Sequence, residues 1–212
     1  MKKSMLKNGL LLGLFALLCT GLVAVVNQLT FAKIKQQEQI ELSRVLQQLI
    51  PAQLYNNALT QHCITIAPNP FMGTTKPLPA YIATKNGTAV AIAIETIAPD
   101  GYNGDIKIII GLDHTGKVLG VRTLAHQETP GLGDKIELRK SDWVTSFNGL
   151  SILLNTDKRW NVKKDGGDFD QFTGATITPR AYVKAVKNAT LYFNAHKDEL
   201  FSTPVTCGVT NE

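Results

Sequence analysis

Charged residues are few in this sequence, and no cluster of basic side chains occurs after its first eight residues. Of 212 residues, 22 are Lys or Arg and 17 are Asp or Glu, which gives a net charge of +5. Without Lys2, Lys3 and Lys7, 19 basic residues face 17 acidic ones, so residues 8–212 carry only +2. No stretch there interleaves Lys and Arg with aromatic residues. The composition therefore argues against a nucleic-acid partner.

Patterns typical of metal sites and of catalytic nucleophiles are also missing. The histidines are His62, His114, His126 and His196. They are scattered without the short spacing of metal ligands, so the sequence predicts no metal site. No nucleophile with a base and an orienting group can be assembled from the sequence. An enzyme that acts alone on a soluble substrate is therefore not expected.

Cysteine is scarce, with three residues in the chain. Cys19 lies in a long apolar stretch, which leaves Cys63 and Cys207 for the remainder. In an oxidising compartment these two could form a disulfide that ties the C-terminal tail to the start of the domain. Such a bridge would stabilise the fold by about 4 kcal/mol or somewhat more. The residues leave bridged and free thiols both open.

The longest feature that is present is an uncharged stretch that begins at Gly9. It runs without a charge through Val26 to Ala32, which is enough for the about 20 residues of a membrane-spanning helix. The lysines before it favour a cytoplasmic N-terminus. The sequence therefore predicts one transmembrane helix over residues 9–32 of a membrane-anchored protein, whose outer side in a Gram-negative cell is the periplasm. Residues 1–8 would lie in the cytoplasm and the bulk of the chain in the periplasm.

A cleaved signal peptide is the alternative interpretation of this stretch. Against it, the apolar run exceeds the usual core of about 7 to 15 residues, and no small-x-small cleavage site closes it. Leu17-Leu18-Cys19 resembles a lipoprotein cleavage box only loosely, because a small residue is expected before the cysteine. An uncleaved anchor is therefore favoured.

An amphipathic helix is predicted from Lys33 to Ile50, ended by Pro51. Its apolar residues follow the helical spacing i, i+3, i+4, i+7: Leu42, Val45, Leu46 and Leu49. This stripe is expected to pack against the protein's own domain rather than a partner. The segment Ala67–Pro79 holds four prolines and a glycine, so it is expected to be a loop.

Two hairpins are predicted next, and they indicate an antiparallel sheet. Asn86-Gly87 joins Ala80–Thr84 to Ala89–Ile94, and this dipeptide is the strongest short hairpin signal. The second hairpin joins residues 105–112 to residues 117–124 through His114-Thr115-Gly116. The sequence does not determine the order of the strands.

Two further turn regions connect these elements to the rest of the chain. The cluster Pro99–Gly104 could border a ligand site, although a plain connecting loop is the simpler interpretation. Ser141 and Asp142 are expected to cap a short helix that Gly149 ends. Residues 160–168 are predicted to be a strand end that passes into a glycine turn.

The stretch Asp170–Thr176 reads Asp-Gln-Phe-Thr-Gly-Ala-Thr and leads into a predicted helix. Thr178 is expected to cap this helix, and Pro179 to be its first residue. Thr176 would then lie about two residues before the positive end of the helix dipole, where an anion is favoured by about 0.3 to 1 kcal/mol. On pattern alone, the stretch also fits an ordinary helix cap.

Two segments in the right order resemble a known family. Asp170–Thr176 is similar to the flavinylation motif Asp-x-x-(Ser/Thr)-Gly-Ala-Thr, whose last threonine carries FMN through a phosphoester made by a flavin transferase from FAD. His126–Gly133 resembles the Glu-Thr-Pro-Gly-Leu-Gly segment that lines the flavin pocket in the same family. Over its full length the chain resembles the G subunits of the Rnf complexes, which are ion-translocating electron-transport assemblies of bacterial inner membranes.

The resemblance implies a membrane-anchored electron-transfer subunit with FMN covalently bound to Thr176. The complex would couple electron transfer between ferredoxin and NAD to ion transport, and the subunit would have no independent turnover. The residues implied around the phosphate are Thr173, Gly174, Ala175 and Thr178. Those implied around the ring are Glu128, Thr129, Gly131 and Leu132. Lys163 or Lys164 would be a charge partner of the phosphate or flavin, and Asp170 would serve the transferase.

Two alternatives stay open beside this interpretation. The C subunit of the sodium-pumping NADH:quinone reductase shares the design but is usually longer. A non-redox, membrane-anchored interaction module would use the threonine turn merely as a helix cap. The expected partners are other membrane subunits, the flavin transferase and the lipid bilayer.

With 44% hydrophobic residues in 212, the chain can build one core beside a membrane segment. The predicted fold is α+β, with an N-terminal transmembrane helix and one outer domain that holds an antiparallel sheet and packed helices. Its predicted parts are a cytoplasmic N-terminus (1–8), the transmembrane helix (9–32), an amphipathic helix with the first part of the periplasmic domain (33–98), an FMN-binding domain (99–197) and a C-terminal tail (198–212).

Overall fold

The computed structural model of the chain describes residues 2–152 and 154–206. The chain divides into two compact units, Met1–Leu42 and Ser43–Glu212. Cys207 lies outside the described residues, so the predicted bridge to Cys63 stays a prediction.

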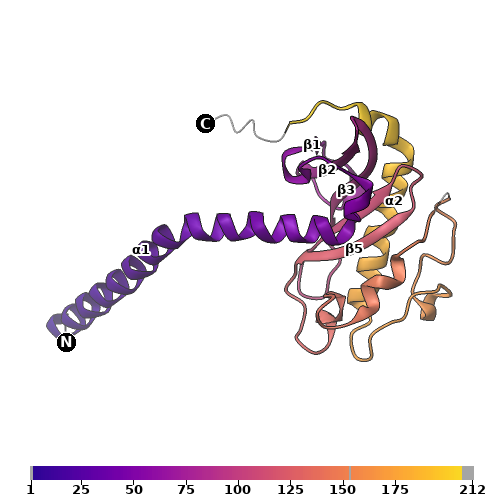
Figure 1. The fold of residues 1–212 in the computed structure, drawn as a ribbon. Helices are drawn as coiled ribbons and strands as arrows, with labels where there is room; N and C mark the ends of the chain where they lie inside the picture. Colours follow the sequence, from indigo (N-terminus) through magenta and orange to yellow (C-terminus); the bar gives the residue numbers. More distant parts are fainter. Residues whose placement is uncertain (1, 153, 207–212) are drawn as a thin grey trace. The chain divides into compact units, whose positions relative to one another are not determined.

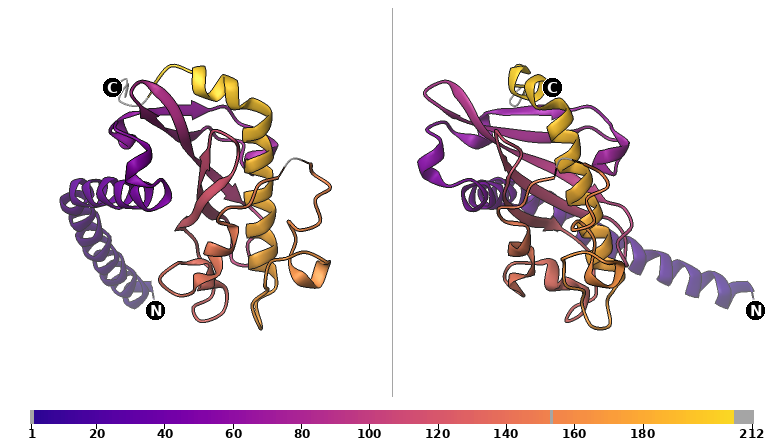
Figure 2. Two further views of the ribbon diagram at one scale, coloured as in Figure 1. Left: turned by 45° about the vertical axis from the view of Figure 1, so that its right-hand side comes forward. Right: turned by 90° about the vertical axis from the view of Figure 1, so that its right-hand side faces the viewer.

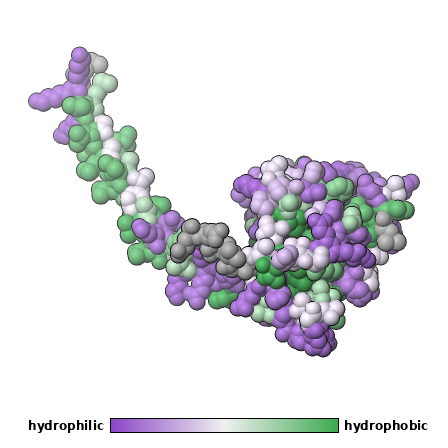
Figure 3. All heavy atoms as spheres, turned by 90° about the horizontal axis from the view of Figure 1, so that it is seen from above, coloured by the Kyte–Doolittle hydropathy of each residue, from purple (hydrophilic) through white to green (hydrophobic). Residues whose placement is uncertain are grey.

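The N-terminal helix α1 spans Lys2–Leu49 and joins the two units. Among the described residues it is the one helix long and apolar enough to cross a membrane. Apolar side chains cover most of the first unit, with hydrophilic side chains at its N-terminal end (Figure 3). The two helices expected over residues 9–32 and 33–50 are one continuous helix, which ends just before Pro51 as expected.

The second unit is built on one five-stranded antiparallel sheet (Figure 1). The strands follow the chain in the order β1-β2-β3-β4-β5, so each pairs with the next through a hairpin or loop. Their bounds are β1 Cys63–Ile66, β2 Leu78–Lys85, β3 Thr88–Ala98, β4 Ile106–Asp113 and β5 Val118–Ala125. The predicted α+β fold and both predicted hairpins are confirmed.

The first hairpin turns at Asn86 and Gly87, whose φ angles are 54° and 81°. Two consecutive positive φ angles define the tight turn that suits the twist of a hairpin, and Asn and Gly tolerate them best. Strand β1 was not predicted, since it has only four residues and reaches β2 across a proline-rich loop.

The predicted loop Ala67–Pro79 is more ordered than expected. It contains a 3-10 turn at Pro70–Met72, held by an Asn69 side chain that accepts from the Phe71 N–H, and it includes the first two residues of β2. Met72 is buried, and its carbonyl accepts a bond from Thr96. Proline here fits the start of a helical turn, because a missing N–H costs nothing at that position.

The C-terminal helix α2 spans Ile177–Ser202 and lies across one face of the sheet (Figure 2). The expected buried positions Val183, Val186 and Phe193 are at most 2% exposed and belong to the core. Alternate residues of β3 and β4, such as Ile94 and Ile108, supply the sheet side of this core. Burial of these side chains is the main source of the stability of the unit.

The end of α1 covers the opposite face of the sheet. Gly111 and Gly120 are direct partners on β4 and β5. A Cβ atom on either glycine would come within 3.2 to 3.3 Å of Leu49, so the glycine pair makes room for that side chain. The expected packing of the stripe on its own domain is confirmed, since the following residues are buried: Val45, Leu46 and Leu49. The sheet is thus covered on both faces.

Glu95 is buried on this second face, at 2% exposure, and pairs with Lys107 across β3 and β4. The two atoms of the pair, Oε2 and Nζ, are 2.7 Å apart. Burial raises the pKa of the Glu95 carboxyl, and the bond from Lys107 opposes that rise.

Short 3-10 helices fill the connections: Ala52–Leu54, Leu59–Gln61, Pro70–Met72, Gly133–Ile136, Asp142–Phe147 and Lys163–Asp165. The predicted short helix after Ser141 is confirmed, and the Ser141 side chain accepts a bond from the Trp143 N–H. The strand end expected before the glycine turn of residues 160–168 is only one isolated bridge, between Val162 and Phe169.

Helix α2 starts earlier than expected. Its first residue is Ile177 and its N-cap is Thr176, so Thr178 is not the cap and Pro179 is the third helical residue. The prediction for Thr178 and Pro179 was wrong because the turn before the helix closes two residues sooner. At the other end, α2 continues to Ser202.

Candidate functional site

The site lies where the start of α2 meets the two loops that leave β3 and β5. A pocket of about 270 Å³ opens there. Its lining residues are Tyr102, Glu128, Thr129, Leu132, Gly133, Gly174, Ala175, Thr176, Ile177 and Thr178. The volume is slightly below the about 300–1,000 Å³ of pockets that enclose most of a ligand. A larger molecule bound here would therefore keep part of its surface exposed.

The structure brings both sequence motifs to this one pocket. Seven of the residues that the resemblance implied line it: Glu128, Thr129, Leu132, Gly174, Ala175, Thr176 and Thr178. The other four are not in the lining of the described pocket: Thr173, Gly131, Lys163 and Lys164. The two motifs touch directly, because a Cβ atom on Gly174 would lie 3.4 Å from the Leu132 side chain.

A tight turn presents the end of the second motif. The Ala175 N–H donates to the Phe172 carbonyl at 3.1 Å, and Gly174 adopts φ 80°, which favours glycine. The turn is anchored at its start by aromatic packing. The Phe172 ring is 5% exposed and lies edge-on to Trp143, with 5.0 Å between centroids. Trp143 Nε1 also donates to the Asp170 carbonyl at 2.7 Å.

Thr176 therefore stands at the N-cap of α2, between an anchored turn and a long helix. Within the described chain its hydroxyl makes no capping hydrogen bond. The residue lines the pocket, at the helix end whose N–H groups and dipole favour an anion by about 0.3 to 1 kcal/mol. This position is closer to the positive end of the dipole than the sequence indicated.

Glu128 forms the junction of the pocket walls. Its carboxylate is buried, with 4% of the residue exposed, and accepts bonds from the Thr178 hydroxyl and from the Asn103 N–H at 3.2 Å. A Cβ atom on Gly133 would lie 2.8 Å from this carboxylate, and one on Gly101 would lie 3.0 Å from it. Glycine is thus required on both sides for the loops to close around Glu128. Thr178 serves this junction and not the helix cap.

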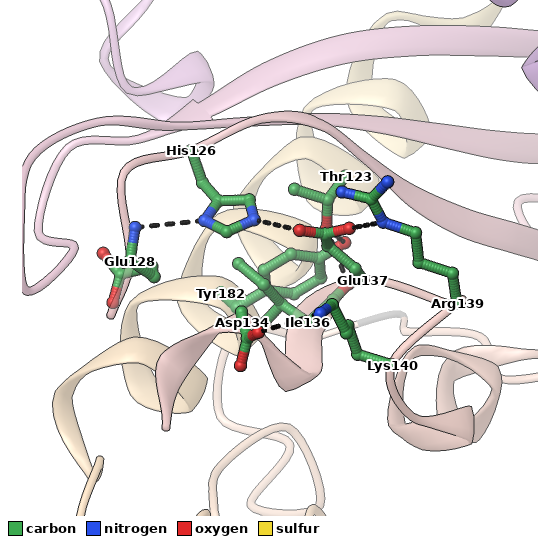
Figure 4. Close-up of polar contacts among 9 residues, drawn as sticks. All are labelled: Thr123, His126, Glu128, Asp134, Ile136, Glu137, Arg139, Lys140 and Tyr182. Carbon is green, nitrogen blue, oxygen red and sulfur yellow. Dashed lines mark hydrogen bonds and ion pairs between the residues drawn. The ribbon is translucent and has the colours of Figure 1, made fainter. Parts of the chain in front are cut away.

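A series of hydrogen bonds through His126 fixes the backbone of the loop that carries Glu128 (Figure 4). The Glu128 N–H donates to Nδ1 of His126 at 3.0 Å. Because Nδ1 accepts, the ring proton is on Nε2, which donates to Oε1 of Glu137 at 2.8 Å. The other Glu137 oxygen accepts from Arg139. These bonds, that from Arg139 first, lower the pKa of Glu137 below its usual value.

The 3-10 turn beneath the pocket is tied to α2 through Thr123. The Thr123 hydroxyl donates to the Ile136 carbonyl at 2.7 Å and lies 3.1 Å from the Tyr182 hydroxyl (Figure 4). Burial raises the pKa of Tyr182, so this phenol stays protonated. No local pattern in the sequence indicates these contacts, since their partners are far apart in the chain.

Asp170, the acid of the second motif, lies on the surface beside Lys163. The Lys163 Nζ and Asp170 Oδ1 atoms are 2.6 Å apart, and both side chains are more than half exposed. Lys164 is exposed as well. In residues 2–152 and 154–206, no group of three or more His, Cys, Asp or Glu side chains could hold a metal ion.

Comparisons with known proteins match both parts of the chain. The model of the FMN-binding domain matches residues 101–190, which hold the pocket, and that of the RnfG N-terminal region matches residues 1–49. The G subunit of the ion-translocating oxidoreductase complex of Shewanella piezotolerans is 77% identical over 212 residues and covers all of both chains. That of Shewanella oneidensis is 65% identical, covering 98% of each chain. That of Vibrio cholerae is 56% identical, covering 95% of this chain and 96% of its own.

Proposed function

The chain belongs to the family of G subunits of ion-translocating oxidoreductase complexes, and on that premise we propose that it carries FMN as a phosphoester on Thr176. It is a flavin-carrying, membrane-anchored subunit with a redox role in such a complex. The observation that carries the covalent proposal is the position of Thr176, which lines the pocket at the start of α2 and whose side chain makes no capping bond among the described residues.

The residues around the pocket fit a flavin mononucleotide in two ways. The phosphate end would lie at the N-terminus of α2, where backbone N–H groups and the helix dipole favour its charge. The ring would lie against the apolar side chains of Leu132 and Ile177, each more than two-fifths exposed without a ligand. When bound, the flavin supplies the chemistry of accepting and releasing electrons.

The protein's own residues would hold and tune this group. Glu128 places a buried carboxyl group in the wall of the pocket, where hydrogen bonds from Thr178 and Asn103 fix it. Thr129, Gly174 and Ala175 would bound the flavin beside it. Thr173 and Gly131 would act through the backbone of the two turns. Lys163 would bind the phosphate or flavin only after leaving Asp170, and Lys164 is the alternative.

Attachment would use a separate flavin transferase, because a threonine hydroxyl is a poor nucleophile at neutral pH unless an adjacent base activates it. The Thr176 oxygen would attack the phosphorus of the FMN half of FAD, AMP would leave and the hydroxyl proton would be released. The transferase would recognise the exposed Asp170. The subunit would have no turnover of its own.

The membrane arrangement is part of the proposal. The uncharged part of α1 would cross the bacterial inner membrane once, with the N-terminal lysines in the cytoplasm and the second unit in the periplasm. The other subunits of an Rnf-type complex would then exchange electrons with the flavin, between ferredoxin and NAD. The lipid bilayer would surround the uncharged part of α1.

Coexpression with a flavin transferase tests the attachment. The denatured wild-type protein should give a fluorescent band on a gel under ultraviolet light, and Thr176→Ala should abolish that band. Thr178→Ala serves as the control and should keep it. A wild-type protein without the band would leave the non-redox interaction module as the better explanation.

A further inference from the structure

Tyr102 is the most exposed large apolar side chain in the pocket lining, with 66% of its surface accessible. It lies in the turn Pro99–Gly104 between β3 and β4, far in sequence from both motifs. Large aromatic side chains stabilise a protein when they are covered, so one left open beside a cavity marks a place for an apolar or aromatic ligand.

The turn that carries this ring is fixed on both sides. Before it, Asp100 forms an ion pair with Lys184 of α2. After it, the Asn103 side chain donates to the Gln127 carbonyl at 2.8 Å, and the Asn103 N–H donates to Glu128. The backbone of Tyr102 is thus tied both to α2 and to the loop that follows β5.

The glycine beside Tyr102 shows how closely this turn is packed. A Cβ atom on Gly101 would lie 2.2 Å from the Gly104 carbonyl oxygen and 3.0 Å from the Glu128 carboxylate. The turn therefore has little room to move as a whole. The ring is held at the pocket by a fixed backbone, although the ring itself is uncovered.

Three apolar side chains meet around the opening from three separate segments of the chain. Tyr102 comes from the β3–β4 turn, Leu132 from the loop after β5 and Ile177 from the start of α2. Each of the three is more than two-fifths exposed. A flat aromatic ring system inserted between them would cover all three at once. The tricyclic ring of a flavin has this shape, and it would reach this opening from Thr176.

We propose that the Tyr102 ring stacks on the isoalloxazine ring of the flavin carried by Thr176. This inference rests on the proposed function. A phenol ring in contact with a flavin quenches its fluorescence, because an electron passes from the phenol to the excited flavin and then returns. Nothing is consumed in that cycle, so the effect reports contact alone.

The experiment uses the full chain in detergent after coexpression with a flavin transferase. Fluorescence intensity and lifetime are measured per covalently bound flavin, which the visible absorbance of the native protein gives. Tyr102→Leu should raise both severalfold, since the quencher is removed. Tyr102→Trp should lower both below wild type, because indole is the better electron donor. Phe71→Leu, which removes an exposed aromatic ring from another turn, should change neither.

Two results would overturn the stacking. One is equal fluorescence lifetimes in wild type, Tyr102→Leu and Tyr102→Trp. The other is a rise in Phe71→Leu as large as that in Tyr102→Leu. Failure of the proposed function looks different, because wild-type protein would then carry no visible flavin absorbance after denaturation.

Discussion

Thr178, two residues after the flavin motif, has a structural role. Its side chain is 1% exposed and donates to the buried carboxylate of Glu128, which joins the start of α2 to the loop after β5. Thr176, two residues earlier, lines the pocket, and its side chain makes no capping bond within the described chain. The two threonines are close in sequence but have different roles: Thr178 holds the fold together, and Thr176 is the proposed attachment residue.

Replacing Thr178 by valine should destabilise the second unit without removing the flavin. Valine keeps the shape of threonine but leaves the Glu128 carboxylate without one donor, which costs about 1 to 3 kcal/mol. Thermal unfolding of the full chain in detergent should show a lower midpoint, while the fluorescent band stays. Thr173→Val is the matched control on the exposed turn and should unfold as wild type. An unchanged midpoint in Thr178→Val would contradict the junction.

Glu137 gives the site a defined dependence on pH. Its pKa is lowered in the folded protein, by Arg139 first and also by His126. A lowered carboxyl pKa adds stability above the unfolded value of about 4.3, and this stability is lost as pH falls through the folded pKa. Glu137→Gln should therefore lower the unfolding midpoint at pH 7.

The difference between Glu137→Gln and wild type should shrink as the pH falls below about 4.3 and through the lowered folded pKa of Glu137, below which both carry a neutral side chain. Urea unfolding at pH 7 and at pH 3 measures it. Asp198→Asn removes an exposed carboxylate of α2 and is the control. A difference that grows on acidification would have the wrong sign for this network.

At the scale of elements, the residue pattern predicts local features best. The Asn86-Gly87 hairpin and the Ser141 cap depend on neighbouring residues, and both occur as expected. Strand β1 was missed because its pairing partner lies beyond a loop of more than ten residues. The start of α2 was predicted wrongly because the Thr178 side chain, which was expected to cap the helix, instead donates a hydrogen bond across the fold to Glu128.

In the site too, residues in local motifs could be predicted, and residues placed by distant contacts could not. Thr176, Glu128 and Leu132 could be found because they lie in two short motifs. The turn Pro99–Gly104 was predicted only as a possible border of a ligand site, because the contacts to Glu128 and α2 that bring Tyr102 to the pocket follow from no local pattern. The role of His126 was also out of reach, since its partner Glu137 is eleven residues away, in the segment after a 3-10 turn.

The end of α1 is expected to be an essential part of the sheet unit. Leu49 is 1% exposed and fills the space above Gly111 and Gly120. Leu49→Ala should lower the free energy of unfolding of the second unit by about 2 to 5 kcal/mol, as expected for a leucine removed from a packed core. Leu29→Ala, 75% exposed in the first unit, should leave that unfolding unchanged in detergent. Equal effects of both would mean that α1 does not support the sheet.

At the scale of the whole molecule, the C-terminal tail returns to the first strand. The Thr206 N–H donates to the Cys63 carbonyl at 2.8 Å, and the Thr206 hydroxyl lies 3.2 Å from that of Thr65. The residue before Cys207 is therefore next to Cys63, which supports the predicted disulfide.

Thiol labelling of the native full chain tests this disulfide. When the purified chain is unfolded without a reductant, the label should modify Cys19 alone. When it is unfolded with a reductant, the label should modify all three cysteines. Cys63→Ser is the control, since it should expose Cys207 to labelling without reduction. Labelling of Cys63 and Cys207 in unreduced wild type would rule the bridge out.

Peptide mass spectrometry of the protein purified after coexpression with a flavin transferase tests the central claim most directly. The peptide that contains Asp170–Thr176 should gain the mass of one FMN less one water, and fragmentation should place this gain on Thr176. The same peptide from Thr176→Ser should also be modified, since serine keeps the hydroxyl. An unmodified wild-type peptide, or a gain that fragmentation places on Thr173 or Thr178, would contradict attachment at Thr176.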